Sequence, residues 1–308
     1  MTGHRPFFLE LDEDGLDGLS ARVLASARPG DFAVLDADNT LWRHDLCESL
    51  LALLEVEGIL SVGRLDPALR THEPTEDGSL YGHARTLPGR VGIDAAYRWM
   101  TRIFAHLPVD LLKEQVDRLM RRSEPVPYLV RVDGCGTVEH VNPPVIHPAQ
   151  QRLVRRLREA GLGVHVVTGA LGVVARMVLC DPRYGFALPP ASVHGARLAP
   201  VPGDTGNLTG TLAIREPVTW YAGKPAVVRA RIARVRRPLL VAGDSPSDWE
   251  MLAHCDADRG VRLWVDRSER HTKALVEALG QDPSVPGAGD GTGTVAGWVR
   301  VTPEQLAS

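Results

Sequence analysis

The most constraining feature of the chain is a pair of acids, Asp36 and Asp38, that directly follows the short apolar run Phe32 to Leu35. An unbroken apolar run is typical of a buried strand, so the chain brings two carboxylates to the end of its own core. Like charges held together repel each other, and removing them from water costs several kcal/mol unless a cation or hydrogen-bond donors compensate. The sequence therefore predicts a site that supplies such compensation.

Further short apolar runs predict the fold class, a Rossmann-like parallel α/β sheet. A helix is expected over 148–162, where Leu153, Leu157 and Leu162 recur at nearly helical spacing, and it leads into the second strand. Ligands of such sheets bind beyond the carboxyl ends of the strands, and the first three runs end in polar residues, which favours one shared site. Strands are expected over residues 32–38, 163–170, 237–244 and 261–266.

About 120 residues separate the first two expected strands, far more than a single crossover needs. Alternating character around Asp133-Gly134 predicts a hairpin over 128–141, and Asn142-Pro143-Pro144 marks the return to the sheet. The simplest account is a separate, mainly helical unit inserted after the first strand. Its helices are expected over residues 46–60, 92–107 and 109–123.

We expect two domains on this basis. Residues 1–44 and 146–308 form a catalytic core, and residues 45–145 form the inserted helical cap. Within the core, residues 191–215 are expected to form two strands joined by a turn. The segment 280–297 is rich in glycine and proline but lacks GxGxxG spacing, so we expect a loop and no phosphate cradle.

Composition excludes several classes of protein. The net charge is −3 and the isoelectric point is near 6.4, which argues against a nucleic-acid partner. No apolar stretch approaches the roughly 18 residues that span a bilayer, and no secretory signal is evident, so no membrane partner is expected. The four cysteines are scattered without CxxC spacing, which favours a reducing compartment and a cytoplasmic location.

Four short motifs stand where chemistry is expected. Taken singly, each has an ordinary structural explanation, because Asp and Gly form turns, Ser and Asp cap helices, and a lysine is usually a solvated surface charge. Lys224, however, is one of only three lysines in the chain. The motifs are Asp36-x-Asp38-Asn39-Thr40, Thr168-Gly169, Gly223-Lys224 and Gly243-Asp244-Ser245-Pro246-Ser247-Asp248.

The order of these motifs, DxDxT, then a hydrophobic residue with Thr-Gly, then Lys, then GDxxxD, resembles the haloacid dehalogenase (HAD) superfamily of phosphohydrolases. The insertion lies where the phosphoserine-phosphatase-like branch has its helical cap. More narrowly, the strings DNTLWRHDLCESLLALLE, TWYAGK and RPLLVAGDSPSDWEML are similar to bacterial phosphorylcholine-phosphatase-like hydrolases. The resemblance implies a phosphoric monoester hydrolase.

Phosphate esters resist hydrolysis because their anionic oxygens repel a nucleophile, so an enzyme mainly supplies positioning and positive charge. The resemblance implies that Asp36 attacks phosphorus and forms an aspartyl phosphate, and that Asp38 acts as acid and then base. The oxygens of the transferring group would be held by Thr168, Gly169 and Lys224.

The resemblance also implies a Mg²⁺ cofactor, which prefers hard oxygen ligands. The ligands would be the carboxylates of Asp36 and Asp244 and the backbone carbonyl of Asp38. Asp248 would complete the metal site by orienting a metal-bound water, or would orient Lys224.

Four residues near the first motif are candidate substrate contacts: Asn39, Thr40, Asp45 and Glu48. Asp45 lies where capped relatives place a substrate-contacting acid, and Glu48 follows it on the same helical face. A solvated acid at a helix start would serve the helix dipole equally well. Four aromatic residues could form a cation–π box for a quaternary ammonium group, although packing roles are expected: Trp42, Tyr81, Tyr97 and Trp99.

The sequence thus predicts a Mg²⁺-dependent phosphatase that hydrolyses a small organic phosphate monoester. A phosphotransferase, or a non-catalytic binding protein of the same fold, remains the alternative. Ser247 replaces the Asn that phosphoserine phosphatases usually have, which argues against phosphoserine as substrate, and Thr168 differs from the Ser frequent in phosphorylcholine phosphatases. Neither the substrate nor the oligomeric state follows from the sequence.

Overall fold

The computed structural model describes residues 8–11, 15–70, 79–132, 135–281 and 297–307. Seven parallel strands form one sheet in the order β1-β11-β10-β9-β2-β7-β8. The strands are β1 (Leu9–Glu10), β2 (Phe32–Leu35), β7 (Gly163–Leu171), β8 (Val193–Ala196), β9 (Leu240–Gly243), β10 (Val261–Val265) and β11 (Trp298–Val301).

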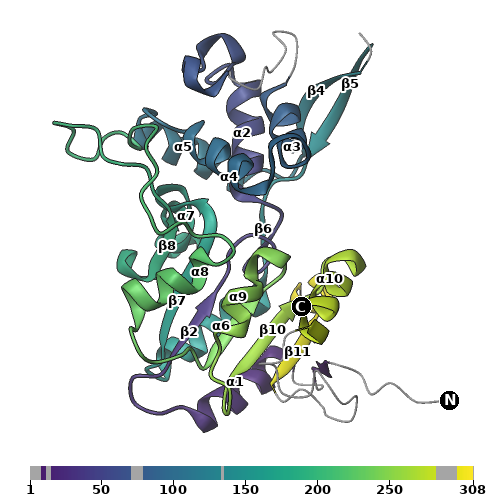
Figure 1. Ribbon diagram of the computed structural model, residues 1–308, viewed down its shortest axis with the longest axis vertical. Helices are drawn as coiled ribbons and strands as arrows, with labels where there is room; N and C mark the ends of the chain where they lie inside the picture. The colour runs from purple at the N-terminus through teal and green to yellow at the C-terminus, as the bar shows by residue number, and fades with distance from the viewer. Residues whose placement is uncertain (1–7, 12–14, 71–78, 133–134, 282–296, 308) are drawn as a thin grey trace.

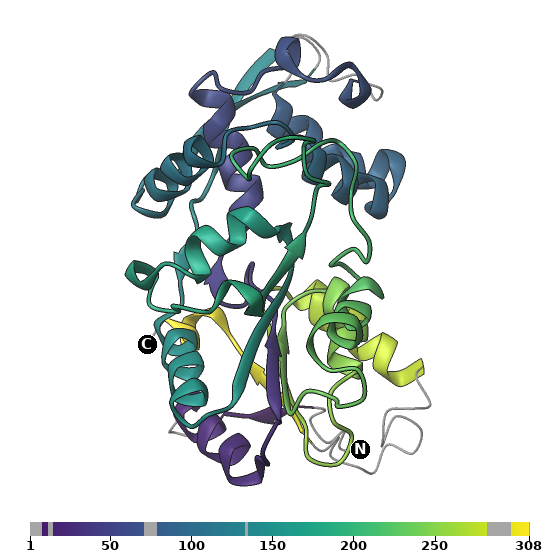
Figure 2. The same ribbon diagram turned by 90° about the vertical axis from the view of Figure 1, so that its left-hand side faces the viewer.

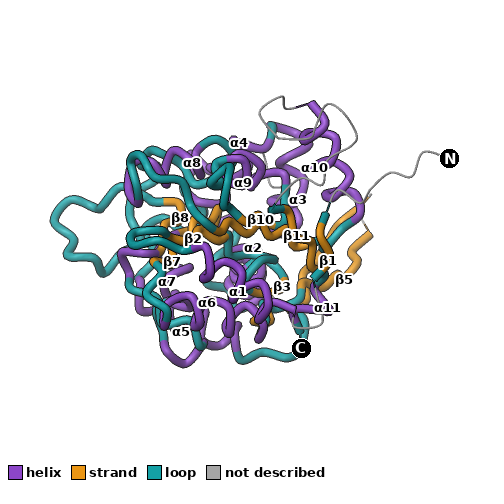
Figure 3. The backbone as a smooth tube through the Cα atoms, turned by 90° about the horizontal axis from the view of Figure 1, so that it is seen from below, coloured by secondary structure: helices purple, strands orange, loops and turns teal. Residues whose placement is uncertain are grey.

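Helices cover both faces of this sheet, as Figure 3 shows from below. Both central strands, β2 and β9, are therefore buried along their whole length, which explains their unbroken apolar sequences. One face packs against α1 (Gly15–Ser26), α6 (Pro148–Glu159), α7 (Gly172–Leu179) and α11 (Pro303–Leu306), and the other against α8 (Gly223–Val227), α9 (Trp249–Ala253) and α10 (Glu269–Gln281).

The expected fold class, a Rossmann-like parallel sheet, is confirmed. The strand that leads to Asp36 is, however, the second in the chain, because the two-residue strand β1 precedes it at the sheet edge. A two-residue pairing has too little pattern to be recognised in a sequence.

The long insertion forms a lobe at one end of the sheet (Figures 1 and 2). The chain leaves through β3 (Trp42–Arg43) and returns through β6 (Val145–Ile146), and these strands pair antiparallel. The lobe contains α2 (Leu46–Val56), α3 (Leu80–Val91), α4 (Ile93–Arg102), α5 (Val109–Met120) and the hairpin strands β4 (Val126–Val132) and β5 (Cys135–Val141).

Three of these helices and the hairpin match the expected elements. The expected turn at Asp133-Gly134 lies outside the described residues, as does most of the glycine- and proline-rich segment, 282–296. Apolar residues of the lobe and of the sheet belong to one continuous buried cluster, so the division into a core (1–44 and 146–308) and a cap (45–145) stays a prediction.

One expectation about the sheet is wrong. Residues 191–215 were expected to form two strands, but only β8 is a strand, and it joins the main sheet. The following chain makes irregular antiparallel contacts instead, with a bridge between Leu198 and Ile214 and a hydrogen bond from Thr211 N to Ala199 O of 2.7 Å. Glycines and prolines in this stretch interrupt the regular ladder.

Among the described residues, no helix is both long and apolar enough to cross a membrane.

The start of α3 depends on an acid from another helix. Glu55 of α2 accepts hydrogen bonds from the Ser79 hydroxyl (2.8 Å) and from the backbone N–H groups of Leu80 (2.6 Å) and Tyr81 (3.2 Å). These N–H groups have no acceptor within their own helix, and the helix dipole favours a negative charge there.

We therefore expect Glu55→Ala to lower the free energy of unfolding by about 1–3 kcal/mol. Glu57, the residue that directly follows helix α2, is a matched control, because its side chain pairs, among the described residues, only with Arg118 at 2.8 Å near the surface. Glu57→Ala should cost less than about 1 kcal/mol. Urea denaturation of the three proteins measures both values, and equal losses would contradict the capping role.

Candidate active site

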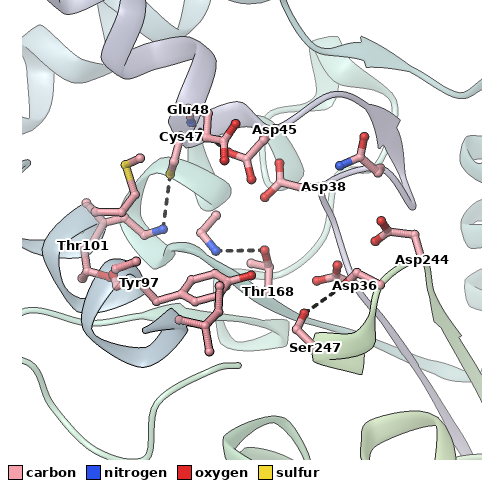
Figure 4. Close-up of a pocket in the computed structure, with 18 of the residues that line it drawn as sticks. Asp36, Asp38, Asp45, Cys47, Glu48, Tyr97, Thr101, Thr168, Asp244 and Ser247 are labelled. Carbon is pink, nitrogen blue, oxygen red and sulfur yellow. Dashed lines mark hydrogen bonds between the residues drawn. The ribbon is translucent and has the colours of Figure 1, made fainter. Parts of the chain in front are cut away.

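Side chains from several strand ends and helices meet in a single cavity of about 170 Å³ at the carboxyl edge of the sheet (Figure 4). The loop after β2 supplies the DxD acids, β7 supplies Thr168, the loop after β9 supplies Asp244 and α8 supplies Lys224. Strands that run parallel bring their carboxyl ends to the same edge, which explains why distant motifs converge. The predicted residues that line the cavity are Asp36, Asp38, Asn39, Asp45, Glu48, Thr168, Gly169, Lys224 and Asp244.

Lys224 neutralises the centre of this acidic site. Its ammonium group donates to Asp36 Oδ1 at 2.7 Å and also to Asp248 Oδ1, although only 1% of the lysine is exposed. Burial opposes the charge of Lys224, but Asp248 and Asp36 together raise its pKa above the usual range. Burial and the negative charge of Asp248 raise the pKa of Asp36 to about 7, although Lys224 partly offsets them.

The Asp248 carboxylate holds the loop after β9 in place by hydrogen bonds. Its Oδ2 accepts from the backbone N–H groups of Asp244 (3.2 Å) and Ser245 (3.1 Å) and from the Ser245 hydroxyl (3.0 Å), while Oδ1 accepts from Lys224. A Cβ atom at Gly243 would lie 2.6 Å from the Cβ of Asp248, so the tight turn requires glycine. Both Asp248 oxygens are occupied by protein donors, which supports the role of orienting Lys224.

Asp244 is 2% exposed, and its carboxylate has two side-chain partners among the described residues. The Thr40 hydroxyl donates to its Oδ1 at 3.4 Å, and the Arg267 guanidinium donates to its Oδ2. Burial raises the pKa of Asp244 well above its usual range, although Arg267 opposes that shift.

These acids fit a divalent cation. One carboxylate oxygen from each of Asp36, Asp244 and Asp248 lies within 4.8 Å of the others, and all three residues are buried. A set of carboxylate oxygens is the donor type that Mg²⁺ prefers. The repulsion between these acids is therefore the kind that a dication would relieve.

Two hydrogen bonds hold the carboxyl group of Asp38 in a fixed direction. Its Oδ1 accepts from the indole N–H of Trp42 and from the backbone N–H of Leu46 at the start of α2, both at 2.8 Å. Burial and the nearby charge of Asp45 raise its pKa well above the usual range. A neutral carboxyl group held in a fixed direction can donate a proton to a leaving oxygen.

Asp45 and Glu48 form a second acidic group beside Asp38, as Figure 4 shows. Asp45 caps α2 by accepting from the Glu48 N–H at 2.8 Å, so a role at the helix start and a place in the cavity coexist. Burial raises the pKa of Asp45. Burial and the charge of Asp45 raise the pKa of Glu48 to about 7.

The aromatic residues mostly serve packing, as expected. Trp42 and Trp99 are buried and donate their indole N–H groups to Asp38 and to the Leu69 carbonyl, respectively. Tyr81 packs edge-on against Tyr128, with its hydroxyl 3.4 Å from Glu48. Tyr97 alone of the four candidates is among the residues that line the described cavity.

The apolar wall of the cavity was not predicted, because most of its residues lie on α3 and α4 and show only helical packing patterns. Arg267 was also missed, although it directly follows the expected strand 261–266 at the functional edge of the sheet. Its position directly after an expected strand could have identified Arg267 as a candidate site residue. The unpredicted wall residues include Cys47, Ala84, Pro88, Ile93, Ala96, Met100, Thr101 and Leu171.

With this geometry established, comparison with known proteins gives the family. The pattern of the haloacid dehalogenase-like hydrolases matches residues 33–253, and the chain belongs to this family. A relative, the phosphorylcholine phosphatase of Pseudomonas aeruginosa, is 35% identical over an alignment of 317 residues that covers 94% of this chain and 90% of that protein. The expected family and the narrower resemblance are confirmed, and together they support the expected phosphoric monoester hydrolase.

Two solved structures show the same fold. A functionally unknown protein from Anaerococcus prevotii superposes with a TM-score of 0.63 at 17% identity, covering 90% of this chain and 91% of its own. A protein of unknown function from Bordetella pertussis gives a TM-score of 0.55 at 17% identity, covering 88% and 97%.

The raised pKa of Asp36 predicts how the metal-free protein responds to pH. The folded state binds a proton up to about pH 7, whereas the unfolded state releases it near 3.8, so this residue's contribution destabilises the fold as pH rises through that window. We expect metal-free Asp36→Asn to melt at a higher temperature than the wild type at pH 8, with the difference shrinking below pH 6. Thermal melts in EDTA across this range test it, and a difference independent of pH would contradict it.

Proposed function

We propose that the protein is a Mg²⁺-dependent phosphatase that transfers the phosphoryl group of a small ester first to Asp36 and then to water. The observation that carries the proposal is the convergence of Asp36, Lys224 and Asp244 in one buried cavity at the carboxyl edge of the sheet. The family of the chain and its phosphatase relative support the same chemistry.

In the first step an Asp36 oxygen attacks phosphorus, and the bond to the ester oxygen breaks as Asp38 gives that oxygen a proton. In the second step Asp38 takes a proton from water, whose oxygen attacks the phosphorus of the aspartyl phosphate. Inorganic phosphate leaves, and the Asp36 carboxylate is restored. The raised pKa of Asp38 supports its role as the acid of the first step.

The remaining residues hold the transferring group. Lys224 would neutralise the oxygens on phosphorus, and Thr168 with the Gly169 N–H would fix their direction. Bound Mg²⁺, held by the Asp36 and Asp244 carboxylates, would supply the additional positive charge that the phosphoryl oxygens need. Asn39 Oδ1 accepts from the His44 N–H at 3.0 Å, which supports a role for Asn39 in shaping the loop around the site.

We further propose that the preferred substrate is the phosphate ester of a small cationic alcohol, with choline phosphate as the leading candidate. The cavity lining combines the Asp45 and Glu48 carboxylates with an apolar wall that includes Ile93, Tyr97 and Met100. Carboxylates attract a quaternary ammonium group, while apolar and aromatic surface packs against its methyl groups. The phosphorylcholine phosphatase relative supports this choice.

The helical insertion, residues 45–145, is proposed to act as the cap of this site. Helices α2, α3 and α4 supply the wall opposite the sheet, and the cavity of about 170 Å³ suits a small ester. Excluding bulk water would strengthen the electrostatic interactions inside it.

Removal of the nucleophile tests the reaction. We expect Asp36→Asn to lower kcat for p-nitrophenyl phosphate by at least about 10³-fold, and chelation of Mg²⁺ to have a similar effect. A phosphate-release assay, with folding checked by circular dichroism, measures both. Equal amounts of phosphate released and ester consumed are expected, since a phosphotransferase would release less. Retained turnover in the variant would refute the mechanism.

The carboxylates of Asp45 and Glu48 give a prediction about substrate specificity. We expect Glu48→Gln to raise KM for choline phosphate about tenfold or more, because the cation loses a partly buried carboxylate. KM for p-nitrophenyl phosphate, whose alcohol part carries no positive charge, should stay within about twofold.

For the wild type, KM for choline phosphate should also fall as pH rises from 6 to 8, because Glu48, with a pKa of about 7, becomes ionised in that range. Glu48→Gln should lose that trend. If KM changed in the same way for both substrates, a cation-binding role of Glu48 would be contradicted. The proposed phosphatase reaction would still stand.

A further inference from the structure

Arg267 is the one cavity-lining residue with strong charge to which neither the motifs nor the proposed mechanism gives a function. It follows β10, the neighbour of the strand β9 that leads to Asp244, and Trp264 lies in register with Gly243. The Nε atom of Arg267 donates to Asp244 Oδ2. Among the described residues no other acid lies within ion-pair distance of Arg267.

The charges around the cavity explain why an arginine is useful there. Lys224 is the only other cation that lines the described cavity, and its ammonium group is committed to Asp36 and Asp248. Without Arg267, the buried Asp244 carboxylate would have only the Thr40 hydroxyl as a side-chain partner, at 3.4 Å. A buried carboxylate without a cation is strongly unfavourable.

A divalent cation and the guanidinium would compete for this acid. Asp244 contributes an oxygen to the cluster in which Asp36, Asp244 and Asp248 lie within 4.8 Å of one another. A guanidinium has no lone pair to offer a metal, so it cannot join the coordination, and two cations a few ångströms apart repel each other.

The structure also offers the guanidinium a second position. The side chain of Arg267 is 34% exposed, and it borders a neighbouring polar cavity of about 280 Å³ as well as the active-site cavity. Glu304 lines that second cavity and forms no ion pair within the described part of the chain. Asp266, also in its lining, already accepts from Arg300 at 2.8 Å and from Thr272 at 2.5 Å.

We propose that Arg267 is a positioning residue that stands in for the metal: its guanidinium neutralises Asp244 in the metal-free enzyme and moves toward Glu304 when a divalent cation binds. The exchange sets the metal affinity, because binding must break one ion pair before it makes the metal site. The inference rests on the proposed Mg²⁺-dependent function.

Metal binding to the intact protein tests this directly. Isothermal titration with Mg²⁺, and electron paramagnetic resonance with Mn²⁺, would compare the wild type with Arg267→Gln. We expect the variant to bind metal about tenfold more tightly, because a competing cation has been removed. Its metal-free form should melt at a lower temperature, because Asp244 has lost its partner.

Two further substitutions serve as controls. Arg267→Lys retains the charge and should restore most of the wild-type affinity. Arg270→Gln, at an exposed residue on α10, should change neither the metal affinity nor the melting temperature.

The second position is tested by a double-mutant cycle. Glu304→Gln should weaken metal binding about threefold to tenfold in the wild type but not in Arg267→Gln, because Glu304 acts only through the displaced arginine. Equal effects of Glu304→Gln in both backgrounds would overturn the second position.

Equal or weaker metal binding by Arg267→Gln would overturn the stand-in role, even if the wild type binds metal and hydrolyses phosphate esters. Failure of every variant and of the wild type to bind a divalent cation would instead overturn the proposed function itself, and the stand-in role with it.

Discussion

The structure depends on compensation of buried negative charge by Lys224. This lysine is 1% exposed and bonds to Asp36 and Asp248 at once, across 188 residues of sequence in the first case. A buried lysine is unfavourable by itself, and so is each buried acid, but together they remove much of one another's penalty. The remaining excess of acid is what makes the pocket suited to a dication and to a phosphoryl group that arrives with it.

Such an arrangement is tolerated because the scaffold around it is conventional. The central strands β2 and β9 are completely buried and pair in register, so the loops that follow them start from fixed positions. Local rules then complete the site: Asp248 closes a capping box with Ser245, and Gly243 permits the close approach of that turn. The unfavourable charges are confined to loop ends, where a packed sheet can hold them.

Much of the fold and of the candidate site was predictable, because most motif residues follow the same apolar runs that predict the strands. The acids after 32–35 and the Gly-Asp after 237–242 each follow an apolar run, and parallel strands bring such ends together whatever their separation in sequence. What escaped prediction depended on tertiary contacts. Helix α3 contains Pro88 and two glycines, which weaken its pattern, and its start is capped by Glu55 from another helix.

Arg267 shows a different limit of sequence reasoning. Its position after a strand pointed to the site, but an arginine in a chain rich in arginine has no distinguishing pattern, and only the pairing with Asp244 reveals its place. The apolar wall around Met100 and Ile93 is difficult to predict for a similar reason, because helical spacing predicts which residues are buried but not which of them face a cavity.

In the proposed mechanism, the first turn of α2 links catalysis to specificity. The Leu46 N–H donates to Asp38, the Glu48 N–H donates to Asp45, and the same turn carries Glu48 itself. One helix start therefore orients the proposed acid of the reaction and the two carboxylates proposed to bind the substrate cation. The positive end of the helix dipole also favours negative charge on these groups. Any movement of the helical lobe must therefore either leave this turn in place or carry Asp38 with it. An opening of the cavity through α3 and α4, which make no such bond to the DxD loop among the described contacts, would preserve the hydrogen bonds that orient Asp38.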